Sequence, residues 1–296
     1  MSDSTDTIHR FLFDETQIRG EIVTLEESYQ QATTHQSLPG EGKRMLGRFL
    51  AATVLMAETL KIDGTVSLQV KGKEGPVRFA FAEAHSNGEV RCMLKMEDNI
   101  AAQDSFFTQD IPKVFEGGVL TITIDPAEGD RYQGIVPLEG STLAACLESY
   151  FVRSEQLQTR FYLFADDTRA AGLMLQALPL EIADNKEDAD KRAAFDEAWT
   201  TAVALSDTLT QEELLTDSHQ VLLNKLYHEL PCRFFPGRSL RFGCSCNEMR
   251  SANALASIGK DEAFMLLAES TPIVIDCEFC AAHYEFDKEK LDRIFS

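Results

Sequence analysis

Four of the seven cysteines lie in two short-spaced pairs near the C-terminus, and no other feature of the sequence restricts the fold as strongly. The first pair, Cys244 and Cys246, has C-x-C spacing, and the second, Cys277 and Cys280, has C-x-x-C spacing. A structural Zn²⁺ takes four ligands in a tetrahedron, and two such pairs that meet in space supply them without histidine. The spacing therefore predicts one Zn²⁺ per chain, held by these four thiolates.

The residues around the two pairs do not resemble those around ordinary buried cysteines. Phe242 and Gly243 precede the first pair and Asp276 precedes the second, so turn-forming and charged residues replace a periodic apolar face. Segment 232–296 is also short enough that its own core should be marginal.

Zinc binding at this segment would have a large effect on its stability. Structural zinc contributes about 10–16 kcal/mol to the folding of small domains, so its loss should unfold the segment. A metal-bound thiolate is also the oxidisable form of cysteine. The site is therefore a structural staple or a redox switch, and spacing alone leaves both open.

The sequence predicts an α+β protein with three parts: a domain around an antiparallel sheet at residues 1–181, a helical connector at 182–231, and a zinc-binding domain at 232–296. In the first part, apolar residues at helical spacing over 42–60 predict a mostly buried helix. Alternating apolar and polar residues predict four strands. These strands lie around 66–70, 77–81, 90–94 and 120–124.

The first domain should end with a helix and a return to the sheet. Ser141 is a plausible N-cap for a helix that runs to about Arg153. The apolar stretch at 160–180 then returns to the sheet. A charged stretch at 184–192 follows and marks the start of the connector.

The connector is expected to be helical and amphipathic until Pro231 stops it. Thr210 and Glu213 have the spacing of a capping box at the start of a helix. An apolar stripe at helical spacing precedes them; it should pack on the sheet domain, and it is a candidate surface for binding other proteins if it becomes uncovered. The stripe consists of Phe195, Trp199, Ala202 and Leu205.

The overall charge argues against two classes of binding partner, nucleic acids and anionic membranes. A formal net charge of -20 and a pI near 4.7 would repel both a nucleic-acid backbone and an anionic membrane surface. No apolar stretch is long enough to span a bilayer, and the acidic, polar N-terminus does not have the order of a secretory signal. We therefore expect a cytoplasmic protein that binds neither nucleic acid nor membrane.

With these motifs in order along the chain, the sequence resembles the heat-shock protein 33 family of redox-regulated holdase chaperones. The resemblance covers the whole chain and departs from the family pattern at Asn247, where a small hydroxyl residue is expected, and at Ile258, which replaces leucine. Neither departure touches a ligand. The most specific segments are 242–246 with Arg250, Gly259 with Glu262, 277–280 with Tyr284 and Phe286, and 169–176.

The resemblance implies a chaperone that is not an enzyme and is inactive when reduced and zinc-bound. It implies that oxidation joins Cys244 with Cys246 and Cys277 with Cys280 in disulfides and releases the zinc. The zinc domain would then unfold and destabilise the connector, exposing apolar surface that holds unfolded or oxidatively damaged clients without ATP. Members of the family also form homodimers on activation.

Two other classes of function remain open from the residues alone. A thiol oxidoreductase would use Cys277 and Cys280 catalytically, although such a pair normally lies at the start of a helix and needs no second pair. A zinc-stapled binding protein would keep its metal without redox switching. The other cysteines have simpler interpretations: Cys92 and Cys146 as core thiols, and Cys232 as an incidental thiol whose ionisation Arg233 could favour.

Overall fold

The computed structural model describes residues 5–14, 16–60, 63–97, 110–179 and 186–296. Within it the chain forms two compact units, Met1–Phe242 and Gly243–Ser296. The observed mixture of sheets and helices confirms the predicted α+β class. The predicted boundary at 182 lies outside the described residues, and the three-part division stays a prediction.

The larger unit contains two sheets, each with six strands among the described residues. The first has the order β10-β1-β2-β9-β8, with β11 also paired to β1. Its strands are β1 (Thr7–Phe13), β2 (Ile18–Leu25), β8 (Thr159–Ala165), β9 (Ala170–Ala177), β10 (Cys232–Phe234) and β11 (Arg238–Ser239). The second has the order β12-β5-β4-β3-β6-β7. Its strands are β3 (Gly64–Lys71), β4 (Val77–His85), β5 (Glu89–Met96), β6 (Val119–Pro126), β7 (Tyr132–Pro137) and β12 (Arg241–Phe242).

Helix α2 (Gly40–Leu60) packs against strands of both sheets and forms the centre of the main core. The prediction of a buried helix over 42–60 is confirmed, because the residues at helical spacing are all buried: Met45, Leu46, Phe49, Ala52 and Met56. The predicted strands at 66–70, 77–81, 90–94 and 120–124 are also present, as β3, β4, β5 and β6.

Shorter helices complete this side of the unit: α1 (Glu27–Thr33), α3 (Ile111–Val114), and α4 (Leu143–Tyr150), which continues as a π-helical turn to Glu155. The prediction of Ser141 as N-cap is wrong by one residue. Thr142 is the N-cap, and its side chain accepts a hydrogen bond from the Ala145 amide. Thr142 has the extended backbone conformation of an N-cap, which lets its hydroxyl reach the Ala145 amide.

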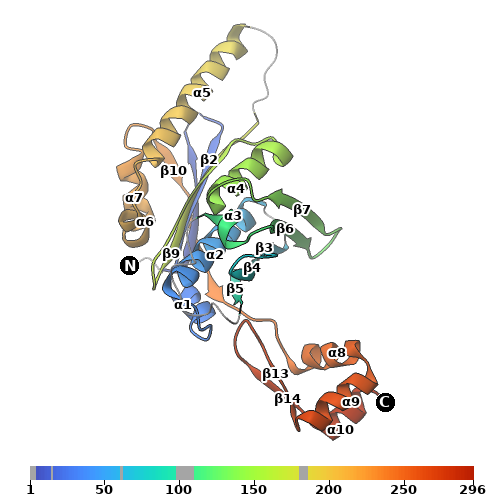
Figure 1. Ribbon diagram of the computed structural model, residues 1–296. Coiled ribbons are helices and arrows are strands. Elements are labelled where there is room, and N and C mark those ends of the chain that lie inside the picture. Colours follow the sequence, from blue (N-terminus) through green and yellow to red (C-terminus); the bar gives the residue numbers. More distant parts are fainter. Residues whose placement is uncertain (1–4, 15, 61–62, 98–109, 180–185) are drawn as a thin grey trace. The chain divides into compact units, whose positions relative to one another are not determined.

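The other face of the first sheet is covered by α5 (Lys186–Ser206), α6 (Gln211–Thr216) and α7 (His219–Leu226), as Figure 1 shows. These helices pack on side chains from β1, β2 and β9, so that β9 is buried along its whole length. The capping box of Thr210 and Glu213 is present as predicted. The helical part ends at Leu226, before the expected stop at Pro231, and residues 232–234 form strand β10.

A buried histidine lies at the start of α7. The Nδ1 atom of His219 is 2.8 Å from Nδ1 of His9 on β1, and its Nε2 atom is 2.9 Å from the Thr24 hydroxyl on β2. Burial, reinforced by His9, lowers the pKa of His219 to about 3. The contact between helix and sheet therefore depends on an uncharged imidazole.

The smaller unit consists of three helices and one hairpin within its described residues. They are α8 (Glu248–Ile258), α9 (Lys260–Glu269), β13 (Ile273–Asp276), β14 (His283–Phe286) and α10 (Lys288–Ile294). Gly259, with a φ of 92°, joins α8 to α9 in a backbone conformation that favours glycine. The core of the smaller unit has six buried side chains: Leu255, Ala263, Leu267, Ile273, Phe286 and Leu291.

Candidate metal centre

The second cysteine pair lies in the turn of the β13–β14 hairpin. The register pairs Asp276 with His283, so the residues between them form the connection. The Cys277 carbonyl accepts hydrogen bonds from the amides of Cys280 and Ala281, which closes a tight turn. Ala281 has a φ of 55°, which lets the chain reverse into β14. The turn holds Cys277 and Cys280 close together without an intervening helix.

The first pair lies just before α8, and a helix cap fixes the chain there. The Asn247 side chain accepts a hydrogen bond from the Arg250 amide, so Asn247 is the N-cap of α8. The Arg250 guanidinium in turn donates to the Ser245 hydroxyl at 2.5 Å. These bonds explain why Asn247 is tolerated where a hydroxyl residue is expected, since asparagine and serine are equally good N-caps.

All four candidate ligands meet in the smaller unit. Their sulfur atoms all lie within 4.8 Å of one another and are half-buried. The Sγ atoms of Cys244 and Cys277 are 3.6 Å apart, and those of Cys246 and Cys280 are 3.3 Å apart. In a tetrahedral zinc–thiolate site the sulfurs lie about 3.8 Å apart, given a Zn–S bond of about 2.3 Å. The donor set and its spacing therefore fit a single zinc ion, and the ligand assignment stays a proposal.

The four thiols do not ionise equally. Burial raises the pKa of the Cys244 thiol, and burial together with the nearby Cys246 raises that of Cys280. Burial also opposes ionisation of Cys246, but hydrogen bonds from the Tyr284 hydroxyl, at 3.2 Å, and from the other thiols outweigh it and lower its pKa to about 7. The same bond raises the pKa of Tyr284 to about 12. Four thiolates this close would repel one another, and a divalent cation is what such a cluster needs for full ionisation.

The comparisons with known proteins agree over the whole chain. The family model described as "Hsp33 protein" matches residues 6–287. Proteins named "33 kDa chaperonin" from Pseudomonas fluorescens and Azotobacter vinelandii are each 43% identical to this chain. The alignments cover 99% of this chain and 94% of the first relative, and 100% of this chain and 96% of the second. The chain belongs to the Hsp33 family.

A solved structure shares the Hsp33 fold of this chain. It is the crystal structure of the 33 kDa chaperonin (heat shock protein 33 homolog) from Thermotoga maritima, with a TM-score of 0.79 and 22% sequence identity. The match covers 98% of this chain and 97% of that one. The resemblance seen in the sequence is therefore confirmed, and the family is one of chaperones rather than enzymes.

The remaining cysteines of this Hsp33 chain lie outside the cluster. Cys92 and Cys146 are buried in the main core, as predicted, and burial raises the pKa of both. The expectation that Arg233 favours the Cys232 thiolate is wrong. Burial raises the pKa of Cys232, and the nearby Asp14 charge adds to this effect. The Arg233 guanidinium pairs with the Asp14 carboxylate at 3.4 Å.

The stripe predicted as a client-binding surface lies on α5 and packs against the first sheet. Ala202 is fully buried, while Phe195, Trp199 and Leu205 are half-buried against the cluster that includes Phe11. In this form of the Hsp33 chain the stripe is thus partly covered by the sheet. Its role toward clients stays a prediction.

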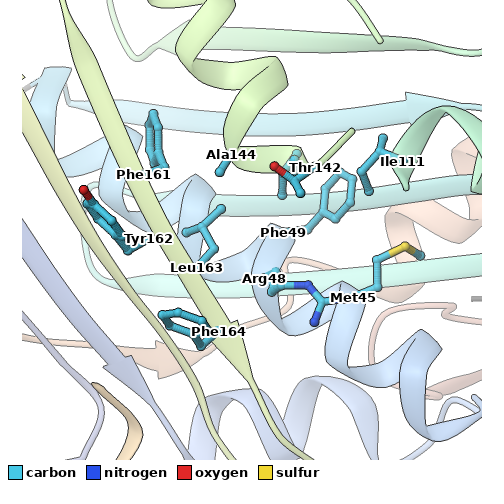
Figure 2. Close-up of a pocket in the computed structure, with 11 residues that line it drawn as sticks. Met45, Arg48, Phe49, Ile111, Thr142, Ala144, Phe161, Tyr162, Leu163 and Phe164 are labelled. Atoms are coloured by element: carbon cyan, nitrogen blue, oxygen red, sulfur yellow. The ribbon is translucent and has the colours of Figure 1, made fainter. Parts of the chain in front are cut away.

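A cavity of about 160 Å³ lies in the larger unit, and none of the predicted site residues lines it. Figure 2 shows Met45, Arg48 and Phe49 reaching it from α2, opposite Phe161 and Phe164 on β8. Its lining is mainly apolar, and burial lowers the pKa of Arg48. The described residues that line the cavity include no cysteine, histidine, aspartate or glutamate.

None of the helices that the structure describes combines the length and apolar character that crossing a bilayer requires.

Proposed function

We propose that this chain is a redox-regulated, ATP-independent holdase whose zinc-bound, reduced form is inactive. Cys244, Cys246, Cys277 and Cys280 would hold one Zn²⁺ per chain, which crosslinks the hairpin turn to the segment before α8. Oxidation would activate the protein in the cytoplasm. Its partners would be unfolded or oxidatively damaged proteins and, once active, a second copy of the chain.

The observation that carries this proposal is the meeting of four thiols in a unit with a small core. Their sulfurs lie within 4.8 Å of one another, while six buried side chains make up the core of the unit. A core of this size gives only marginal stability, so the crosslink among the thiolates should decide whether the unit folds. Loss of the thiolates is therefore a direct route to unfolding.

The proposed oxidation follows simple thiol chemistry. Each near-neighbour pair, Cys244 with Cys246 and Cys277 with Cys280, loses two electrons and forms one S–S bond. One hydrogen peroxide molecule takes up those electrons and two protons and leaves as two water molecules. A sulfur in a disulfide is a poor metal ligand, because the thiolate is the form that binds the cation. After oxidation, neither pair would bind the zinc ion.

The proposed consequence reaches the client-binding residues through the connector at 182–231. Unfolding of the zinc-binding domain at 232–296 would remove the C-terminal anchor of the connector helices. The covered stripe of Phe195, Trp199, Ala202 and Leu205 would then become available to apolar segments of a client. The C-x-x-C pair lies in a hairpin turn rather than at a helix start, which disfavours the thiol oxidoreductase alternative.

The test is light scattering from a thermally unfolding client protein in the presence of this protein, either reduced and zinc-loaded or treated with peroxide under mild heat. Released zinc is measured in the same samples with a colorimetric chelator. We expect suppression of scattering only by the oxidised form, together with about one equivalent of released zinc. Equal suppression by both forms would exclude the switch, and zinc release without suppression would leave the site a structural staple.

Two cysteine-to-serine variants, one outside the cluster and one within it, test the ligand assignment. Cys232→Ser changes a cysteine outside the cluster and should behave as the unchanged protein does. Cys280→Ser changes one proposed ligand and should lower zinc affinity strongly. If the two variants bind zinc equally well, the ligand assignment is wrong.

A further inference from the structure

Residues 232–242, which we call the strap, cover one edge of each sheet in the larger unit, at β1 and at β5. Strands β10 and β11 pair antiparallel with β1, and β12 pairs parallel with β5. Backbone hydrogen bonds link the Phe235 amide to the Arg10 carbonyl and the Leu240 amide to the Asp6 carbonyl. An uncovered sheet edge is a template for pairing with another extended chain, and the strap now occupies both.

Arginines fix the strap to acidic side chains of the larger unit. The Arg238 guanidinium donates to the Glu58 carboxylate at 2.8 Å, and that of Arg241 donates to Glu89 at 2.9 Å. Together with Arg233, they give the strap three basic residues and no acidic one, in a chain whose net charge is -20. Glu58 on α2 and Glu89 on β5 therefore complement the basic residues of an extended segment.

Aromatic and apolar side chains of the strap fill sites beside these ion pairs. The Phe234 ring stacks on His9 with 4.5 Å between ring centroids, and Leu240 is buried in the main core. Gly88 allows the backbone to come close, because a Cβ there would lie 2.6 Å from the Ser239 carbonyl oxygen. The two edges thus accept a chain that combines basic residues with aromatic or apolar ones.

We propose that the edges of β1 and β5 are the docking surface for extended basic–aromatic segments of unfolded proteins. In this structure the strap occupies the site that such a client segment would bind. A client segment would add to these edges as a strand, so that main-chain hydrogen bonds give affinity and the Phe234 and Arg238 positions give preference. This inference rests on the proposed function for one step, the release of the strap on oxidation. It extends that function by naming the chemistry of the client segments.

The strap is held by short strands, and the last of them, β12, lies next to the cysteines in the sequence. Strand β12 has two paired residues, whereas β10 has three, and Gly243 alone separates the strap from Cys244 in the sequence. Unfolding that starts at the cysteines therefore reaches β12 first. Each short strand contributes little by itself, so a disordered chain that follows Phe242 would favour release of the strap from both edges.

Hydrogen exchange on the full-length protein tests the release and the replacement. We expect amides of residues 232–242 to exchange at least about tenfold faster after oxidation. On addition of the unfolded client, protection should return at the outer edges of β1 and β5 but not in the strap. Continued protection of the strap in the oxidised, client-bound protein would overturn the inference.

A peptide tests the docking surface without any oxidation. The probe is a fluorescent peptide of residues 232–242 with Cys232→Ser, and the control is a scrambled peptide of the same composition. The protein is the full chain, reduced and zinc-loaded, with Arg238→Ala and Arg241→Ala to weaken its own strap. We expect the probe to bind this variant at least about tenfold more tightly than the scrambled peptide does, and more tightly than it binds the unchanged chain.

The outcomes separate this inference from the proposed function. Equal binding of probe and scrambled peptide overturns the docking surface, whatever the light-scattering result. If the oxidised protein fails to suppress aggregation, the proposed function fails, while specific peptide binding would still support the docking surface. A charge reversal, Glu89→Lys in the same variant, should weaken binding of the probe and restore it for a probe that carries Arg241→Glu.

Discussion

The two compact units of this chain keep their folds by different means. The larger unit buries two apolar clusters, one around α2 between the sheets and one under α5, α6 and α7. The smaller unit has six buried core side chains and exposes several large apolar ones, such as Met249 and Met265, which are 74% and 60% exposed. Stability in the first unit is spread over many contacts, whereas in the second it would depend on a few contacts and four sulfurs.

This difference shows why a switch belongs in the smaller unit. A large core loses only part of its stability when one contact is removed, because many others remain. A unit held by one crosslink can be unfolded by a change at that crosslink alone. Each prediction below would sharpen this contrast or break it.

The largest effect is expected from removal of zinc. A chelator added to the reduced, zinc-loaded protein should unfold the smaller unit, since structural zinc supplies about 10 kcal/mol or more in small domains. The larger unit should keep its native core. Hydrogen exchange followed by mass spectrometry measures both units in one sample. A metal-free protein whose α8 and α9 amides remain protected would show that the small core suffices.

Truncation of a core side chain in the larger unit should lower the stability of that unit without removing zinc binding. Phe49 is fully buried on α2, so Phe49→Ala should lower the free energy of unfolding by about 3–5 kcal/mol through lost burial and a cavity. Urea denaturation measures the change. Val152→Ala, at a side chain that is 55% exposed, is the control and should change stability by at most about 0.5 kcal/mol. A loss of zinc affinity in Phe49→Ala as large as that in Cys280→Ser would contradict the view that the four thiolates, rather than the large core, hold the zinc.

Acid should act on the larger unit through His219. Its folded pKa of about 3 lies below the value of about 6.5 in an unfolded chain. Between these values the unfolded chain binds more protons, so stability is fully present above pH ~6.5 and falls by up to about 1.4 kcal/mol per pH unit below it. Urea denaturation as a function of pH measures the slope.

His219→Gln is the matched control for this pH dependence, because the amide can still bond to Thr24 but does not titrate. Its stability should depend less steeply on pH over the same range. Equal slopes in the two proteins would show that His219 does not control the response.

The smallest effect is expected at the cap of α8. Asn247→Ala removes the side chain that accepts from the Arg250 amide and should cost the smaller unit about 1 kcal/mol. Zinc transfer to a competing chelator should then occur at a lower chelator concentration. Asn247→Ser should differ from the unchanged protein by only a few tenths of a kcal/mol. Equal losses in both variants would mean that the cap plays no part.

Features with a local pattern could be predicted from the sequence. Helix α2 was predictable because its buried residues recur at helical spacing, and β3 to β6 because their faces alternate. The cysteine cluster was predictable because the chemistry of zinc requires four ligands and the spacing supplies two pairs.

Features that depend on distant partners could not be predicted. The division into two sheets depends on β9, which is buried on both faces and has no alternation to reveal its strand. Strands β11 and β12 have two residues each, too few for any period. At the site, Tyr284 donates to Cys246 only because the hairpin turn brings β14 beside the first pair.

The spacing of the sulfurs along the chain also determines how easily the smaller unit could refold. The close contacts join residues 33 and 34 positions apart, and a bridge over such a loop lowers the entropy of the unfolded chain by an amount equivalent to about 4 kcal/mol. A disulfide between near neighbours closes almost no loop, so the proposed oxidation would free the intervening chain while it keeps each pair together. Reduction would break these disulfides, but the members of each pair would still be near neighbours in the sequence, so refolding would have to bring together two such pairs instead of four unrelated thiols.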